Sequence, residues 1–311
     1  MQINLAQAIS LLKQGEVVAI PTETVYGLAA DATNDEALRQ IFSIKQRPMD
    51  NPLIVHVADV AQVKDWAAEF SPLAKKLAKA FWPGPFTLVL PAKNSVSNIL
   101  RGNNPTVALR VPNHPLTLQL LQQSGLALAA PSANKFTQLS PTTAAHVTAS
   151  LGGQLPVLDG GACAVGIEST IVAVQGESWQ LLRLGMLPEA SIEAVAGMPA
   201  TNTAQIIKAP GQHALHYSPR TPIQLFSSRD DLILHANSHP NARIAALLLG
   251  AGAVPNCTYF ELNNNANGVA QKLYDTLHKM DALNAEKLLI ETPPSQPEWL
   301  AILDRLTRAA A

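Results

Sequence analysis

The stretch KQRPMDNPLIVHV, residues 45–57, contains the end of a predicted helix, a proline that stops it and a predicted buried strand in close succession. Asn34 can cap a helix through residue 44, because the apolar residues after it recur at helical spacing. Pro48 then ends the helix, since proline cannot continue it. The run LIVHV that follows is typical of a short buried strand. A helix joined directly to such a strand predicts helices packed on a β-sheet.

The neighbouring segments predict further strands of the same sheet. Residues 17–20 indicate a strand that runs into PTETVYGL, residues 21–28, and another apolar strand ends at PSAN, residues 131–134. Because helix–strand units alternate with strands that follow one another, we expect an α/β fold with a twisted mixed sheet and packed helices. The expected strands after residue 28 lie at 53–57, 86–90, 107–111, 126–130, 167–174 and 179–184.

The pattern changes after residue 197. Residues 198–221 are rich in Pro, Thr and Ala and have little periodicity, so they are predicted to be a linker between a domain at 1–197 and one at 222–311. Strands and helices alternate regularly in the second domain, which predicts a small doubly wound, Rossmann-like parallel sheet. Its strands are expected at 223–226, 244–249, 258–260 and 287–290, and its helices at 228–237, 266–280 and 297–309.

The composition excludes several classes of protein. The 311 residues are 47% hydrophobic and 14% charged, which is typical of a folded chain with a core and not of a disordered one. The net charge of −1 argues against a general nucleic-acid binder, so any basic feature must be a local pocket. No apolar run reaches the ~18 residues that span a bilayer, and the start of the chain lacks a signal-peptide pattern. We therefore expect a cytoplasmic protein without membrane association.

Two cations stand close together at the predicted helix end. Lys45 and Arg47, before Pro48, would crowd positive charge unless an anion bound there, and Asn51 and His56 follow. Cations at a helix C-terminus can instead complement the helix dipole. Asn51 is compatible with a turn, and a lone histidine in LIVHV is compatible with a satisfied core residue. The residues alone leave these alternatives open.

Other polar residues lie at predicted strand ends. Thr106 and Arg110 are four apart on a strand, so they face the same side of the sheet, and Arg110 needs either a core salt bridge or a substrate carboxylate. Ser132 and Asn134 in PSAN can point into a crevice or form an ordinary turn, and the run Ser140-Pro141-Thr142-Thr143 can cap the helix after it. The chain has no Gly-Lys dipeptide and hence no Walker A loop. Together the residues predict one polar, locally cationic face at the strand ends.

These motifs resemble the YrdC-like threonylcarbamoyl-AMP synthase family in its two-domain form. The paired signature K-x-R and S-x-N stands here at residues 45–47 and 132–134. The resemblance also rests on PTETVYGL (21–28), FWPGPFTLVL (81–90), VALRVP (107–112), GIESTIV (166–172) and HYSP (216–219).

The resemblance implies an enzyme that converts L-threonine, bicarbonate and ATP into L-threonylcarbamoyl-AMP and pyrophosphate. The product would feed N6-threonylcarbamoyladenosine formation at position 37 of tRNAs that read codons starting with A, through a downstream tRNA threonylcarbamoyl transferase complex. A weak direct contact with tRNA is also expected. ATP as a substrate implies Mg²⁺, and no protein ligand for the metal is implied.

The resemblance also implies a role for particular residues. Lys45, Arg47, Ser132 and Asn134 are expected to be catalytic. The threonine site is expected to contain Thr24, His56, Arg110, the backbone at Ala130, and Ser169. The ATP site is expected to contain Arg47, Asn51, Thr106, Ser132, Ser140, Arg183 and Tyr217.

Two other classes of protein are compatible with parts of the sequence. A carbamoyl-transfer enzyme of hydrogenase maturation shares the catalytic domain, but this chain lacks the zinc-finger cysteines and the acylphosphatase region of such enzymes. An RNA-binding protein could use the concave face of the first domain. The balanced charge argues against that class, and salt-dependent retention of RNA would test it.

Overall fold

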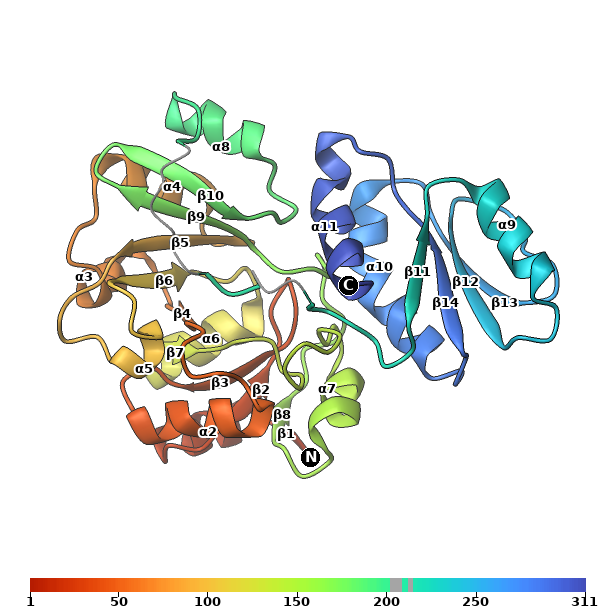
Figure 1. Cartoon of the computed structure of the whole chain (residues 1–311). Helices are drawn as coiled ribbons and strands as arrows, with labels where there is room; N and C mark the ends of the chain where they lie inside the picture. The colour runs from red at the N-terminus through yellow and green to blue at the C-terminus, as the bar shows by residue number, and fades with distance from the viewer. Residues whose placement is uncertain (202–208, 212–214) are drawn as a thin grey trace. The chain divides into compact units, whose positions relative to one another are not determined.

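The computed structural model describes residues 1–201, 209–211 and 215–311 (Figure 1). The remainder of the predicted linker, residues 202–208 and 212–214, lies outside the described residues. The chain divides into two compact units. The first comprises Met1–Phe136, Pro141–Ala164 and Glu168–Gln212, and the second comprises Thr137–Ser140, Val165–Ile167 and His213–Ala311.

The first unit is built on a mixed sheet of ten strands within the described residues. Parallel pairs such as β4/β6 and β5/β9 alternate with antiparallel pairs such as β4/β7 and β5/β6, so the predicted mixed sheet is confirmed. The strands in spatial order are β1 (Gln2–Ile3), β8 (Val157–Leu158), β2 (Val18–Ile20), β3 (Gly27–Asp31), β7 (Leu128–Ala129), β4 (Ile54–His56), β6 (Thr106–Arg110), β5 (Phe86–Pro91), β9 (Thr170–Gln175) and β10 (Ser178–Arg183).

Side-chain caps begin several helices of the first unit, and the expected cap Asn34 is one of them. The side chains of Asn4, Asn34 and Ser71 each accept a hydrogen bond from the first turn of their helix. The run 140–143 caps the helix that follows, as expected, with Thr143 as the capping residue, and Ser140 is fully buried. The helices are α1 (Leu5–Lys13), α2 (Asp35–Lys45), α3 (Val63–Trp66), α4 (Pro72–Phe81), α5 (Asn98–Arg101), α6 (Pro115–Ser124), α7 (Ala144–Leu151), α8 (Glu189–Ala196) and the 3₁₀ turn η1 (Val60–Gln62).

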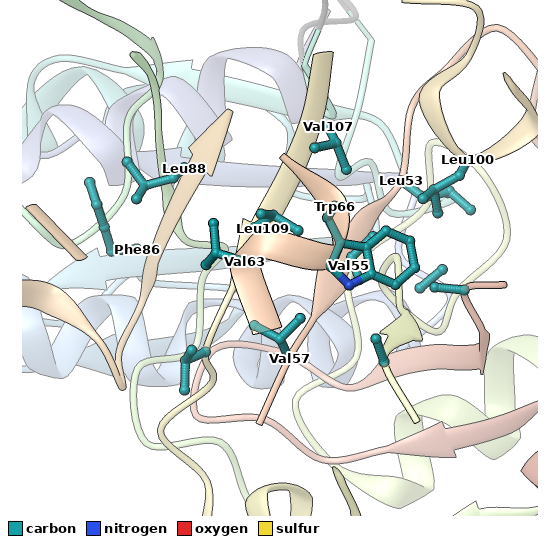
Figure 2. Close-up of a cluster of buried hydrophobic side chains, with 14 of the residues drawn as sticks. Leu53, Val55, Val57, Val63, Trp66, Phe86, Leu88, Leu100, Val107 and Leu109 are labelled. Atoms are coloured by element: carbon teal, nitrogen blue, oxygen red, sulfur yellow. The ribbon is translucent and has the colours of Figure 1, made fainter. Parts of the chain in front are cut away.

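Alternation along the central strands separates the core from the site. Figure 2 shows Val55 and Val57 of one segment packed with Val107 and Leu109 of another in a single buried cluster. Because successive side chains of a strand point to opposite faces, the residues between them lie on the other face. That face carries Thr106, Arg110 and His56 beside a smaller apolar cluster that includes Ile54, Val89, Ala108, Ile171 and Ala173.

The second unit is a sheet of four parallel strands within the described residues, in the order β11 (Ile223–Phe226), β14 (Lys287–Glu291), β12 (Ile244–Leu249) and β13 (Thr258–Leu262). Figure 1 shows α9 (Arg229–Ser238) on one face and α10 (Ala266–Asp281) and α11 (Leu300–Ala309) on the other, with the 3₁₀ turn η2 (Pro297–Trp299) before α11. The predicted doubly wound sheet is therefore confirmed. Across both units, the described helices include none that is long and apolar enough to cross a membrane.

Candidate active site

Lys45 joins the two signature motifs directly. It is the last residue of α2, and its side chain is 1% exposed. Its Nζ donates hydrogen bonds to the carbonyl oxygens of Ser132 and Asn134, both at 2.6 Å. Burial, and then the charges of Arg47 and Lys135, hold the pKa of Lys45 well below its usual value. The lysine of K-x-R thus fixes the S-x-N loop.

The same loop is paired with the segment PTETVYGL. The Leu28 N–H donates to the Pro131 carbonyl at 2.7 Å, and the Ala133 N–H donates to the Tyr26 carbonyl at 2.8 Å. Gly27 lies between these bonds, and a Cβ there would come within 3.0 Å of the Ala130 Cβ. Glycine therefore permits the close approach that brings PSAN against β3.

Arg47 is anchored to the turn that follows it. Its Nη2 donates to the Pro52 carbonyl at 3.0 Å, and its Nε lies 3.4 Å from the Asn51 carbonyl oxygen. Its guanidinium also stacks over the Phe136 ring, with 5.8 Å to the ring centre. The structure therefore brings Arg47 and Asn51 together, beside a loop that contains Ser132 and Asn134.

Gln46 connects the two cations in a conformation that glycine prefers. Its φ of 55° is in the left-handed region, and its side chain is exposed. We expect Gln46→Gly to raise the free energy of unfolding by about 0.5–1 kcal/mol, because glycine adopts this conformation without the Cβ clash. Urea unfolding measures this change. Ser43→Gly, at an exposed position inside α2, is the matched control and should lower stability; a loss of stability in Gln46→Gly would contradict the prediction.

Arg110 is held by three partners on the polar face. Its Nε donates to the Gly84 carbonyl at 3.1 Å, its Nη1 donates to Thr24 Oγ1 at 3.0 Å, and its Nη2 lies 2.7 Å from Glu23 Oε1. All three side chains are buried, at 5% exposed or less. Of the two partners left open by the sequence, the structure contains the salt bridge, and it brings Thr24 into contact with Arg110.

Glu23 is the residue of this cluster that sequence reasoning missed. It stands between Thr22 and Thr24 in PTETVYGL, and of these three residues only Thr24 was expected at the site. Thr22 Oγ1 bonds Thr24 Oγ1 at 2.8 Å and donates to the Val25 carbonyl at 2.7 Å. The threonines thus shape the turn that directs Glu23 to Arg110, and the signal that could have revealed this was the need of Arg110 for an anion.

His56 lies beside Arg110 on the neighbouring strand. The two residues are register partners in the parallel pair β4/β6. Burial, and then the positive charge of Arg110, lower the pKa of His56 to about 3, so its imidazole is neutral at neutral pH. Its Nδ1 is buried and has no hydrogen-bond partner among the described residues. A neutral ring with an unused nitrogen is suited to bind a hydroxyl group.

Ser169 and Arg183 are in direct contact at the next strands of the sheet. Arg183 donates from Nη2 to Ser169 Oγ and from Nε to the Ser169 carbonyl, both at 3.0 Å. Ser169 Oγ also lies 2.8 Å from Thr87 Oγ1 on β5. A residue expected at the threonine site therefore touches one expected at the ATP site.

The threonine-site residues follow neighbouring strands. The order β7-β4-β6-β5-β9 places Ala130, His56, Arg110 and Ser169 on or directly beside strands that are adjacent in the sheet. The Ala130 N–H donates to the Ile54 carbonyl at 3.0 Å, which fixes its position next to β4. Thr106 is 8% exposed at the start of β6 and shares a face with Arg110, as predicted.

Ser140 and Tyr217 belong to the second unit. The Ser140 carbonyl lies 3.2 Å from His278 Nε2, and the Tyr217 side chain is 1% exposed. The Arg305 guanidinium is 5.0 Å from the centre of the Tyr217 ring. Tyr217 has a φ of 60°, which is rare for an aromatic residue and is a form of strain that clusters at functional sites.

Known proteins of one family match nearly the whole length of this chain. The family model for Sua5, YciO and YrdC proteins, described as telomere recombination, matches residues 10–185, and the model for the C-terminal domain of threonylcarbamoyl-AMP synthase matches residues 187–311. The threonylcarbamoyl-AMP synthase of Bacillus subtilis is 38% identical, over 99% of this chain and 93% of the relative. The chain belongs to the threonylcarbamoyl-AMP synthase family.

A second relative extends this likeness to structure. The threonylcarbamoyl-AMP synthase of Pyrococcus abyssi is 36% identical, over 97% of this chain and 93% of the relative. A crystal structure described as P. abyssi Sua5 complexed with L-threonine matches with a TM-score of 0.91 and 34% identity, and covers 100% of this chain and 97% of that one. Family membership favours the enzyme over the two other classes that the sequence left open.

The buried neutral His56 makes stability depend on pH. Its pKa is about 3 when folded and ~6.5 when unfolded, so between these values the unfolded chain binds one more proton. The free energy of unfolding should therefore fall by about 1.4 kcal/mol per pH unit as the pH drops through this window, and this part of the slope should be lost in His56→Gln. Urea unfolding of both proteins at about pH 6.5, 5.5 and 4.5 measures the difference. If the free energy of unfolding falls equally with pH in the wild type and in His56→Gln, His56 protonates in the folded state and the prediction is wrong.

Proposed function

We propose that the protein forms L-threonylcarbamoyl-AMP from L-threonine, bicarbonate and ATP, with release of pyrophosphate, on the polar face of the large sheet. The observation that carries this proposal is that Lys45 donates hydrogen bonds to both carbonyls of the S-x-N loop. Arg47 lies two residues after Lys45, and Arg110 lies on the sheet that this loop follows. Cations and amides arranged in this way suit a reaction that holds several anions close together. The product is proposed to supply the threonylcarbamoyl group of adenosine 37 in tRNA.

The threonine is proposed to bind along β7, β4, β6 and β9. Arg110 would bind its carboxylate, because a guanidinium presents parallel N–H donors that match a carboxylate. Neutral His56 would bind its hydroxyl through the unused Nδ1. Thr24, the backbone at Ala130, and Ser169 would complete the site.

The nucleotide is proposed to bind next to the carbamate end of the threonine. The contact of Arg183 with Ser169 supports this order, because it connects a residue of one proposed site to a residue of the other. Arg47 would neutralise phosphate oxygens, while Lys45 holds the loop that presents Ser132 and Asn134. The other residues assigned to ATP are Asn51, Thr106, Ser140, Arg183 and Tyr217.

The reaction needs positioning more than a protein nucleophile. The threonine amine and bicarbonate combine to a carbamate with loss of water, and a carbamate oxygen then attacks the α-phosphorus while pyrophosphate leaves. Holding the carbamate and the α-phosphate in line removes most of the entropic barrier. Positive groups at the phosphates stabilise the charge that develops as the pyrophosphate departs.

The metal ion, the cellular location and two macromolecular partners are further proposals. Mg²⁺ would accompany ATP and neutralise its phosphates. A cytoplasmic location is proposed from the sequence. The downstream transferase complex that takes up the product, and a weak direct contact with tRNA, are proposed on the same basis.

A kinetic assay tests the function. Purified protein should release pyrophosphate from ATP only when both L-threonine and bicarbonate are present. Pyrophosphate release that is equally fast without threonine would contradict the proposal, since it would indicate hydrolysis of ATP by water.

A further inference from the structure

Glu23 is a buried carboxylate, and one of its two oxygens has no partner among the described residues. Its Oε1 forms the 2.7 Å ion pair with Arg110 Nη2. Its Oε2 is also buried but has no hydrogen-bond partner among the described residues. Glu23 as a whole is 5% exposed. A charged oxygen that is shielded from water and unbonded is unfavourable, so its presence requires an explanation.

The surroundings of this oxygen indicate a ligand. His56 Nδ1, on the strand paired with that of Arg110, is a second buried atom without a partner among the described residues. Arg110 has five N–H donors, and its contacts with Gly84, Thr24 and Glu23 use three of them. Unused acceptor and donor groups thus surround one ion pair, as expected where a polar molecule completes the hydrogen bonding.

The charge of the pair defines which molecule fits. An isolated buried guanidinium would favour a simple carboxylate, because one negative charge would neutralise it. Paired with Glu23, Arg110 leaves the site with no net charge before the ligand arrives. A zwitterion keeps that balance, since its carboxylate can pair with Arg110 and its ammonium group with Glu23. A monoanion would instead place two carboxylates against one guanidinium.

We infer that Glu23 is a threonine-binding residue whose free oxygen accepts a hydrogen bond from the α-ammonium group. This inference rests on the proposed function, in which Arg110 binds the threonine carboxylate. Glu23 then selects an α-amino acid over the corresponding hydroxy acid without an amine. The competing explanation is that Glu23 only holds Arg110 in position.

Binding of two threonine fragments separates these explanations. Calorimetric titration of the full chain would use L-threonine, 3-hydroxybutyrate, which lacks the amine, and 1-aminopropan-2-ol, which lacks the carboxylate. In Glu23→Gln we expect threonine affinity to fall by ~10–100-fold and binding of 1-aminopropan-2-ol to fall with it, because a charge-assisted hydrogen bond is lost. Binding of 3-hydroxybutyrate should stay the same or become tighter, because the competing carboxylate is gone.

Two variants control the experiment. Glu23→Asp keeps the charge and should still prefer threonine over 3-hydroxybutyrate, even if both bind more weakly. Glu177→Gln, the same change at an exposed turn before β10, should bind all three molecules like the wild type. Equal losses for threonine and 3-hydroxybutyrate in Glu23→Gln, or threonine affinity within about twofold of the wild type, would overturn the inference and leave the proposed function standing. Wild-type protein that binds no threonine would overturn the proposed function as well.

Discussion

Replacing Arg47 with alanine is expected to slow threonine-dependent pyrophosphate release by about 10²–10³-fold while the protein stays folded. The loss corresponds to about 2.7–4 kcal/mol of transition-state stabilisation, the usual effect of removing one donor from a developing anion. Stability should fall as well, because two carbonyls of the turn lose their donor and the Phe136 ring loses its cation, but a loss of about 1–3 kcal/mol should leave the protein folded. Turnover under saturating ATP and threonine, together with urea unfolding, measures both effects.

Lys45 and Arg39 provide the comparison for this variant. Lys45→Ala should lose as much activity as Arg47→Ala and should also lose stability, because the carbonyls of Ser132 and Asn134 would lose their donor. Arg39→Ala removes an exposed cation from the same helix and should change neither quantity. Near-normal turnover in both Lys45→Ala and Arg47→Ala would contradict the assignment of this corner to phosphate chemistry.

Replacing Arg110 with alanine is expected to weaken threonine binding by about 10²-fold or more, and ATP binding much less. Charge-assisted hydrogen bonds to a carboxylate contribute about 1.5–3 kcal/mol each, so losing a bidentate contact gives an effect of this size. Calorimetric titrations with threonine and with ATP measure the two affinities separately. The difference between them is the prediction, since a general loss of structure would affect both ligands.

The stability of this variant needs its own control, because Arg110→Ala leaves Glu23 buried without its counter-ion. Removing one partner of a buried ion pair typically lowers the free energy of unfolding by about 3–5 kcal/mol. The double variant Glu23→Gln, Arg110→Met removes both charges and should be more stable than Arg110→Ala, yet it should bind threonine no better. Threonine affinity that recovers in the double variant would mean that Arg110 serves the fold and not the substrate.

The sequence predicted the longer elements well because local patterns determine them. The cap Asn34 and the apolar periodicity after it predicted α2 closely. Strands of two residues, such as β1 and β8, have too short a pattern to detect, and they exist because they pair with each other and with β2. Strand β3 was missed because its residues GLAAD are small and mostly buried on both faces, without alternation.

The candidate site was predictable where it depends on strand parity or recognised motifs. The shared face of Thr106 and Arg110 follows from their spacing on one strand. The bonds from Lys45 to Ser132 and Asn134 join segments 87 and 89 residues apart, and no local pattern determines such contacts. Glu23 was missed for a related reason, since only the folded chain shows that its carboxylate neutralises Arg110.

The most direct test of the account is to follow the carbon of bicarbonate into the product. The protein would be incubated with ATP, L-threonine and ¹³C-bicarbonate, and the nucleotides analysed by mass spectrometry alongside a pyrophosphate assay. We predict one ¹³C-labelled threonylcarbamoyl-AMP for each pyrophosphate released, and neither product when threonine is omitted. Pyrophosphate with AMP but without labelled adduct, or release that does not depend on threonine, would contradict the claim that this site joins a threonine carbamate to AMP.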